Sequence, residues 1–162
     1  MSTITGRRIV RASLDDAARL FLDWSQDARW RAQVRRMTVE PPGPARVGQR
    51  IVEELRFAGL DFVTPTRIEH AGPTDAEYRG AGAMVTVHGA RRLQALPEGR
   101  VALVATLHVR LRGPLRPLTG LLTPSYRRLQ EHDLDRLARI LDSGAPDGDR
   151  TPLQGPPLGS MP

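Results

Sequence analysis

The sequence predicts an α+β domain in which an antiparallel β-sheet packs against a long C-terminal helix. Short segments rich in β-branched and apolar residues, separated by Gly and Pro, fill the middle of the chain, and an amphipathic helical pattern follows them. Two short helical segments follow the first strand. The 162 residues, 40% of them hydrophobic, suit one domain with a single core.

The first elements are a strand at residues 3–12 and a helix from residue 14 to about residue 24. Ser13 stands three residues before Asp16, which is a capping-box-like start for that helix. A short second helix is expected at residues 28–33. Strands should follow at residues 34–40, 49–57, 62–70, 84–96 and 100–111, and residues 77–82 form a weak strand that is expected to merge or bend into the next one. Pro65 in the third of these favours an edge position or a bulge.

The last two strands form the clearest hairpin, and burial predicts its register. A three-residue loop ending at Gly99 pairs Leu96 with Arg100. One face of the hairpin is then almost continuously apolar and is interrupted only by Arg91. The opposite face places His88 across from His108.

The terminal helix is expected to begin with Thr123 as its cap and Pro124 as its first residue. A short helical turn should precede it at residues 115–122, and the helix should end near residue 141. Its apolar stripe includes a carboxyl group, Asp133. The domain therefore spans residues 1–142, and the Gly- and Pro-rich residues 143–162 are expected to form a disordered tail.

Two residue types are missing, and their absence excludes several chemistries. There is no Cys, so disulfides, thiolate metal sites and cysteine nucleophiles cannot occur. There is no Lys either, which excludes Schiff-base catalysis and a P-loop. We find no spacing typical of a metal site or of a dinucleotide fingerprint, so no metal and no cofactor are expected.

The pattern of charge and hydrophobicity bears on localisation and partners. No apolar run approaches the roughly 20 residues of a transmembrane helix, and no secretory signal is visible, so we expect a cytoplasmic protein. Pairs of arginines raise the alternative of an RNA- or membrane-surface-binding protein. The pairs are scattered, and no aromatic residues are interleaved for base stacking, so nucleic acid is not expected as a partner.

The order of elements resembles the SRPBCC superfamily, which includes START proteins, polyketide cyclase/dehydrases and birch-pollen-allergen-like proteins. Residues 9–17, the segment 23–34 with Trp24 and Trp30, and the pair Val47 and Gly48 carry the resemblance. So do residues 112–115 and the run from Asp133 to Leu137. The resemblance implies a helix-grip fold, in which a curved antiparallel sheet wraps around the terminal helix. It also implies a largely apolar cavity for polyketides, lipids or similar molecules.

Arg91 and Asp133 are the first candidate site residues, because each is a charged group on an apolar face. A buried guanidinium needs a partner, so Arg91 could bind a carboxylate, phosphate or enolate oxygen of a ligand. Alternatively, its side chain reaches water at the end of the sheet. Burial should raise the pKa of Asp133 and suit it to general acid or base catalysis, unless it pairs with an arginine. We expect Arg91→Ala and Asp133→Asn to weaken ligand handling and leave the fold intact.

Other candidates come from the strands and the helices. Glu53 and Glu54 are adjacent on a strand, so one of them must face inward, and the sequence does not decide which. We name Glu53 as the candidate ligand-binding residue. His70 and Tyr78 flank a turn and are catalytic candidates with Asp133, although such residues often only close a strand end. The remaining candidates are apolar or aromatic residues expected to line the cavity, namely Trp30, Val87, Leu107, Leu122, Tyr126 and Leu129.

Three functions remain open. We expect the chain to bind a hydrophobic small molecule, either as a cofactor-independent polyketide cyclase/dehydratase-like enzyme or as a non-catalytic lipid or quinone carrier. An enzyme of this kind would need little beyond a shaped cavity and one acid or base. The less favoured alternative is the Arg-rich RNA- or membrane-surface-binding protein.

Overall fold

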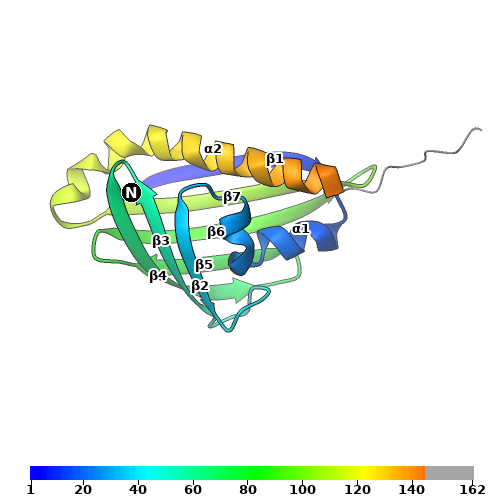
Figure 1. Cartoon of the computed structure of the whole chain (residues 1–162), viewed down its shortest axis with the longest axis horizontal. Coiled ribbons are helices and arrows are strands. Elements are labelled where there is room, and N and C mark those ends of the chain that lie inside the picture. Colours follow the sequence, from blue (N-terminus) through cyan, green and yellow to red (C-terminus); the bar gives the residue numbers. More distant parts are fainter. Residues whose placement is uncertain (145–162) are drawn as a thin grey trace, which may run out of the picture.

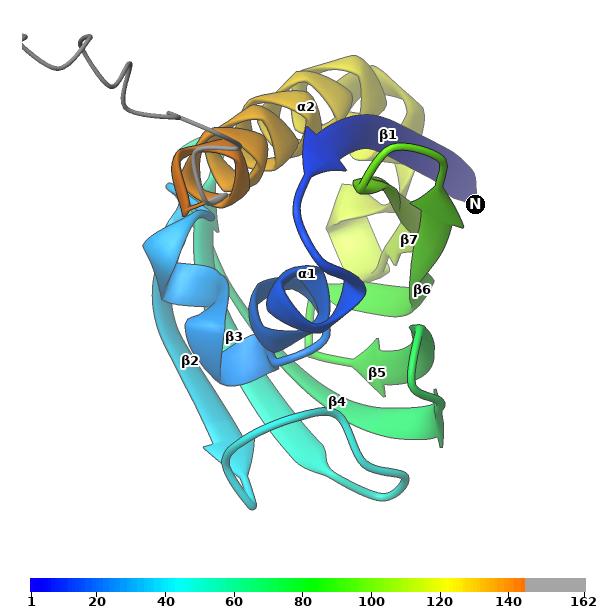
Figure 2. The ribbon, with the colours of Figure 1, turned by 90° about the vertical axis from the view of Figure 1, so that its right-hand side faces the viewer.

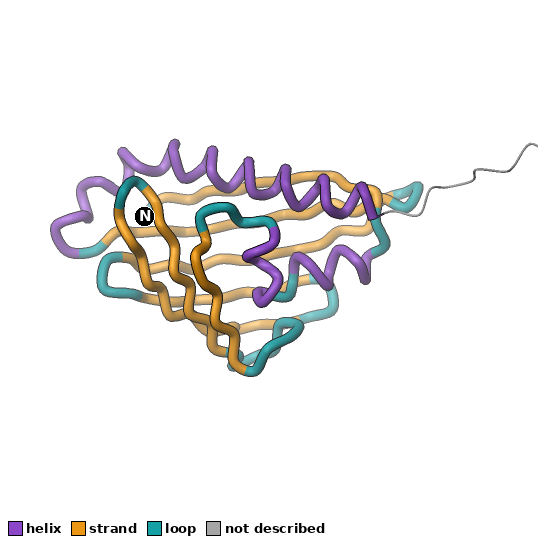
Figure 3. Tube along the Cα trace, in the orientation of Figure 1, coloured by secondary structure: helices purple, strands orange, loops and turns teal. Residues whose placement is uncertain are grey.

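The computed structural model describes residues 1–144, which form one curved sheet and two α-helices (Figures 1 and 3). The elements in chain order are β1 (Ser2–Arg11), α1 (Leu14–Phe21), the 3-10 helix η1 (Trp24–Arg29), β2 (Val34–Glu40), β3 (Arg50–Phe57), β4 (Leu60–Ala71), β5 (Asp75–Ala81), β6 (Val85–Leu96), β7 (Arg100–Leu111), the 3-10 helix η2 (Gly113–Leu118) and α2 (Thr119–Gly144).

The seven strands form a single antiparallel sheet in the order β1-β7-β6-β5-β4-β3-β2. The sheet curls so that its two edge strands, β1 and β2, approach each other, and α2 lies across the opening between them (Figure 2). The expected α+β helix-grip architecture is therefore confirmed. No helix within residues 1–144 is both long and apolar enough to cross a bilayer.

Local capping explains how the two short helices begin. The Ser13 hydroxyl accepts a hydrogen bond from the Asp16 N–H at 3.0 Å, as the capping-box pattern predicts. The first helix nevertheless ends at Phe21, because Asp23 starts a new one by accepting a bond from the Ser25 N–H at 2.9 Å. The second helix accordingly occupies Trp24–Arg29 and not residues 28–33.

The structure of β4 corrects the two alternatives expected for Pro65, an edge position or a bulge. It lies between β3 and β5, so Pro65 is not on an edge strand. The β4–β5 ladder ends at the pair Thr66–Gly80, one residue away from Pro65, where a missing N–H costs least. The irregularity in this strand lies instead between Ile68 and His70.

The terminal helix starts earlier than Thr123 and Pro124 suggest. Helix η2 leads directly into α2 at Thr119, whose hydroxyl accepts from the Leu111 N–H at 3.1 Å and donates to the Arg116 carbonyl at 2.9 Å. Pro124 therefore lies inside the helix. Ser143 and Gly144, the first residues of the expected tail, belong to α2, and residues 145–162 lie outside the described part of the chain.

The β6–β7 hairpin has the expected register, with Leu96 opposite Arg100, Arg91 opposite Ala105 and His88 opposite His108. Its apolar face contributes to two separate groups of buried residues. One group surrounds α1, η1 and the second half of α2, and it includes Phe21, Trp30 and Leu137. The other group lies around Leu55, Phe62, Val85 and Leu111, near the start of α2. The space between the sheet and α2 is thus bounded by two cores.

Candidate functional site

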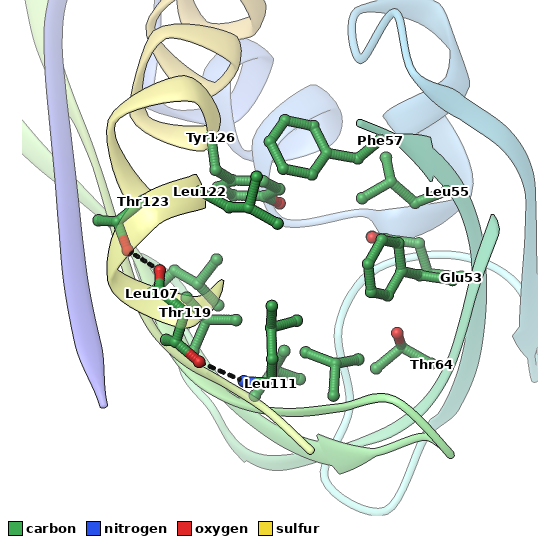
Figure 4. Close-up of a pocket in the computed structure, with 14 residues that line it drawn as sticks. Glu53, Leu55, Phe57, Thr64, Leu107, Leu111, Thr119, Leu122, Thr123 and Tyr126 are labelled. Carbon is green, nitrogen blue, oxygen red and sulfur yellow. Dashed lines mark hydrogen bonds between the residues drawn. The ribbon is translucent and has the colours of Figure 1, made fainter. Parts of the chain in front are cut away.

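The interior between the sheet and α2 is a chamber with two compartments, and the first of them is apolar. This outer compartment has about 570 Å³ of empty space, part of it open to solvent. Figure 4 shows side chains from β3, β6, β7 and α2 pointing into the hollow. They are Glu53, Leu55, Phe57, Phe62, Thr64, Val85, Val87, Leu107, Val109, Leu111, Thr119, Leu122, Thr123 and Tyr126.

The second, inner compartment lies next to α1 and η1 and is half polar. It has about 760 Å³ of empty space, again partly open to solvent. Glu53, Thr64, Val87, Leu107 and Tyr126 line both compartments, so the two are adjacent. The residues that line only the inner compartment are Trp24, Trp30, Arg31, Ile51, Thr66, Tyr78, Arg91, Ala105, Thr106, Gln130, Asp133 and Leu134.

Arg91 points inward from β6, as expected, and its partner is an acid from η1. Its two terminal nitrogens bind both carboxylate oxygens of Asp27, with Nη1 to Oδ1 at 2.8 Å, and Nη1 also donates to the Phe21 carbonyl at 3.0 Å. The guanidinium carbon lies 4.2 Å from the ring centroid of Trp24. Arg91 therefore does not reach out to water, and its two terminal nitrogens are bound to Asp27. That Arg91 also binds a ligand oxygen stays a prediction.

Arg31 is the second interior guanidinium, and three carboxyl groups surround it. Nη1 donates to Asp27 at 3.1 Å and to Glu53, and Nε lies 3.9 Å from Asp133. Burial by itself would lower the pKa of Arg31, but the carboxylates of Glu53 and Asp27 raise it above its ordinary value. Arg31 therefore stays charged and joins the three acids into one network.

The acids of the chamber come from three different elements. Glu53 points inward from β3, whereas Glu54 points outward and lies 3.6 Å from Arg36. Asp133 is only 4% exposed and accepts a hydrogen bond from the Ala32 N–H at 3.1 Å. Burial raises the pKa of Asp133 above its ordinary value, although the Ala32 hydrogen bond and Arg31 partly oppose this shift. Asp133 is thus a buried carboxyl that can exchange a proton inside the chamber.

Two phenols complete the polar groups. Tyr78 from β5 stacks edge-on against Trp24, and Tyr126 from α2 stacks edge-on against Phe57. Burial raises the pKa of both phenols, so both stay protonated at physiological pH. Within residues 1–144 neither phenol oxygen has a protein hydrogen-bond partner. Each can therefore donate to, or accept from, a molecule in the chamber.

The chamber brings together most of the candidate residues, but not His70 or Leu129. The irregularity in β4 shifts the alternation by one residue, so Ala71 packs against the core while His70 is exposed and pairs with Asp75 at 3.1 Å. Leu129 lines neither compartment. At about 100° per residue, it lies roughly 80° from the centre of the inward stripe of α2.

Sequence reasoning missed two residues that organise the site, Asp27 and Arg31. Their spacing of four residues, and the need of a buried Arg91 for an acidic partner, were the available signals.

No group of three metal-ligating residues was found within the described residues 1–144. On the outer face, His88 and His108 stack with ring centroids 5.7 Å apart, and the Thr3 hydroxyl lies 2.8 Å from Nδ1 of His108.

Solved structures share this fold at low sequence identity. A hypothetical protein of Helicobacter pylori has a TM-score of 0.70 at 14% identity, covering 86% of this chain and 88% of that one. A START superfamily protein of Mycobacterium smegmatis has a TM-score of 0.63 at 14% identity, with coverages of 87% and 94%. The ZhuI aromatase/cyclase of a Streptomyces species has a TM-score of 0.66 at 16% identity, with coverages of 88% and 98%.

No curated protein matches the sequence. One family does match, over residues 1–142, and its description is polyketide cyclase/dehydrase and lipid transport. The matched segment includes every strand and nearly all of α2, so the family assignment covers the whole chamber. The chain therefore belongs to the polyketide cyclase/dehydrase and lipid transport family.

Proposed function

We propose that this chain binds a hydrophobic small molecule whose uncharged, oxygen-bearing end lies in the inner compartment. The apolar part of the ligand fills the outer compartment. The observation that carries this proposal is that the two compartments share five lining residues, so one ligand can contact apolar walls and buried hydrogen-bonding groups together. The family description is in keeping with a hydrophobic ligand.

The charges of the inner compartment favour an uncharged polar end. Its two guanidinium groups, Arg31 and Arg91, already face the three carboxyl groups Asp27, Glu53 and Asp133. A ligand carboxylate would add negative charge beside these acids without finding a free cation, which is unfavourable in a buried site. A ketone or hydroxyl group can instead bind the phenols of Tyr78 and Tyr126, which are neutral.

Binding can be tested with the intrinsic fluorescence of the chamber. Both tryptophans of the sequence, Trp24 and Trp30, line the inner compartment. N-phenyl-1-naphthylamine is an uncharged apolar probe that accepts energy from tryptophan, so we expect saturable quenching with sensitised probe emission. Leu122→Glu places a carboxylate in the outer compartment and should weaken probe binding by about tenfold or more.

The matched control is the neighbouring residue Leu121, which is 73% exposed on the other side of α2. Leu121→Glu changes the charge equally and should bind the probe as the parent protein does. If Leu122→Glu and Leu121→Glu bind the probe equally well, the ligand does not occupy the chamber and the proposal is wrong.

Asp133 supports a second candidate function, cyclisation and dehydration of a polyketone. Asp133 is a buried carboxyl group whose pKa is raised above its ordinary value, which favours a role in general acid–base catalysis. The Asp133 carboxylate would take a proton from a methylene between two carbonyls, and the resulting carbanion would attack a distant carbonyl carbon and form a C–C bond. The new alkoxide would recover the proton from Asp133. Loss of this hydroxyl with an adjacent proton would release one water, with no oxidant or reductant.

This reaction separates an enzyme from a carrier. The test substrate is a linear tetraketone with carbonyl groups on alternate carbons, followed by mass spectrometry. An enzyme should convert it to a product lighter by one water, and Asp133→Asn should abolish the conversion while probe binding persists. A tetraketone that is bound but recovered unchanged would support the carrier.

A further inference from the structure

We propose that the segment around η2 and the first turns of α2 docks on an anionic membrane surface. We name this surface the basic tip and define it by Arg112, Arg116, Leu118, Leu121 and Arg128. The tip lies within residues 110–130, a stretch of the sequence that contains five arginines and no Asp or Glu. The whole chain has 18 acidic residues, and because none of them falls in this stretch, it adds positive charge to this end of the molecule without adding a carboxylate.

The arginines of the basic tip are exposed and free to bind an external anion. Within residues 1–144, Arg112, Arg116 and Arg128 form no ion pair, and the only side-chain contact found there is a hydrogen bond from Arg112 to the Gly82 carbonyl at 3.1 Å. Some exposed arginines of the sheet are instead paired with acids. Nε of Arg79 on β5, for example, lies 3.2 Å from Glu69 on β4.

Apolar side chains stand among these cations. Leu118 is 37% exposed and Leu121 is 73% exposed, and both belong to the small set of large hydrophobic residues that the fold leaves in contact with solvent. Leu121 and Arg128 are seven residues apart on α2, so they lie on the same outward face of the helix. Leucines beside unpaired arginines are the combination that binds both the acyl boundary and the headgroups of an anionic bilayer.

The position of the basic tip relates it to the chamber. Helix η2 lies at the end of the molecule that also carries the N-terminus and the β3–β4 and β5–β6 turns (Figure 1). Thr119, Leu122 and Thr123, on the inward face of the same helical turns, line the outer compartment. A bilayer bound to the tip would therefore lie next to the apolar compartment, from which a hydrophobic ligand could pass without crossing bulk water.

These features favour a lipid surface over a nucleic acid. Single-stranded nucleic acid is usually bound by aromatic side chains that stack on bases, whereas the apolar side chains of the basic tip are leucines. A nucleic acid would also gain nothing from exposed Leu121. Near an anionic surface each arginine is expected to strengthen binding by about fivefold, and the effect should weaken as salt rises.

The test is co-flotation of the full chain with vesicles of phosphatidylcholine alone or mixed with phosphatidylserine. We expect binding to the mixed vesicles only. The triple variant Arg112→Gln, Arg116→Gln, Arg128→Gln should lose about 100-fold in affinity. The double variant Leu118→Ala, Leu121→Ala keeps the net charge and should also bind the mixed vesicles more weakly.

The control removes the same charge from the other end of the molecule, with Arg11→Gln, Arg29→Gln and Arg139→Gln, and should keep most of the binding. Equal loss in both triple variants, or equal binding to neutral vesicles, would overturn the proposal. So would tight binding of single-stranded polyuridine that the leucine substitutions leave unchanged. All tip variants should still bind N-phenyl-1-naphthylamine in solution, which separates failure of docking from failure of the chamber.

Discussion

The two compartments of the chamber are held in shape by different forces. The inner one is built on ion pairs, since Arg91 and Arg31 bind acids from η1, β3 and α2. The Arg91 guanidinium also lies against the rings of Trp24 and Trp30. The outer one is walled by apolar side chains that surround empty space. Ion pairs of this kind require definite geometry, whereas apolar walls tolerate changes of shape. We infer that the inner compartment selects the ligand's polar end and the outer one accepts apolar parts of varied form.

The largest effect should follow from breaking the pair between Arg91 and Asp27. Arg91→Ala leaves the fully buried Asp27 carboxylate without its bidentate partner, which we expect to lower the free energy of unfolding by about 3–5 kcal/mol. Urea denaturation measures this change. The expectation from the sequence, that Arg91→Ala leaves the fold intact, is therefore revised.

The double variant Arg91→Met, Asp27→Leu tests the same pair by removing both charges. It should recover most of the lost stability, because neither charge is then left unpaired in the interior. Equal stability of Arg91→Ala and the parent protein would show that the inner compartment does not depend on this pair.

The next-largest loss of stability is expected at Gly89, which packs closely against Tyr78 of the inner compartment. A Cβ added at Gly89 would lie 2.5 Å from the Tyr78 ring and 2.7 Å from the Thr106 carbonyl oxygen, which is backbone and cannot move aside easily. Gly89→Ala should therefore destabilise the protein by about 1–3 kcal/mol in thermal or urea unfolding. A Cβ added at Gly120 in α2 would meet no atom within 4 Å outside the adjoining residues and the backbone of its own helix. Gly120→Ala should leave stability unchanged or raise it by up to about 1 kcal/mol. If Gly89→Ala and Gly120→Ala changed the stability equally, the inferred difference in packing would be wrong.

The smallest effect concerns pH. The pKa of Asp133 is higher in the folded chain than its ordinary value of 3.8, so the folded state holds this proton more tightly than the unfolded state does. The free energy of unfolding should therefore fall as pH rises from about that value toward the raised pKa. Asp133→Asn keeps an acceptor for the Ala32 N–H, but its side chain does not titrate, so this decrease in the free energy of unfolding is absent in the variant. As pH rises, the variant should therefore gain stability relative to the parent protein. Urea denaturation midpoints of both proteins over a pH series measure this difference. If the two midpoints changed in parallel with pH, the pKa of Asp133 would not be raised.

Some of these features follow from local sequence rules. Successive residues of a strand face opposite sides of the sheet, so burial together with the loop at Gly99 predicts the β6–β7 register and places Arg91 inside. The Ser13 cap of α1 follows from a four-residue pattern. In such cases the deciding residues are near one another in the chain or directly opposed in a hairpin.

Other features depend on contacts that the sequence does not reveal. Asp27 binds Arg91 across 64 positions, and no local pattern identifies that pairing. His70 faces outward because one irregularity in β4 reverses the alternation. The predicted start of α2 is four residues or more too late, because Thr123 and Pro124 match the pattern of a helix start although they lie inside a helix that begins directly after η2.

The central claim is that the chamber prefers a ligand with an uncharged polar end, because its arginines are already bound to acids. The most direct test compares n-decanol with decanoate as competitors of N-phenyl-1-naphthylamine, in the parent protein and in Glu53→Gln. We expect the parent to bind the alcohol about tenfold or more tightly than the carboxylate. Glu53→Gln removes one carboxylate from Arg31 and should narrow or reverse this preference. Equal or tighter binding of decanoate by the parent protein would contradict the account.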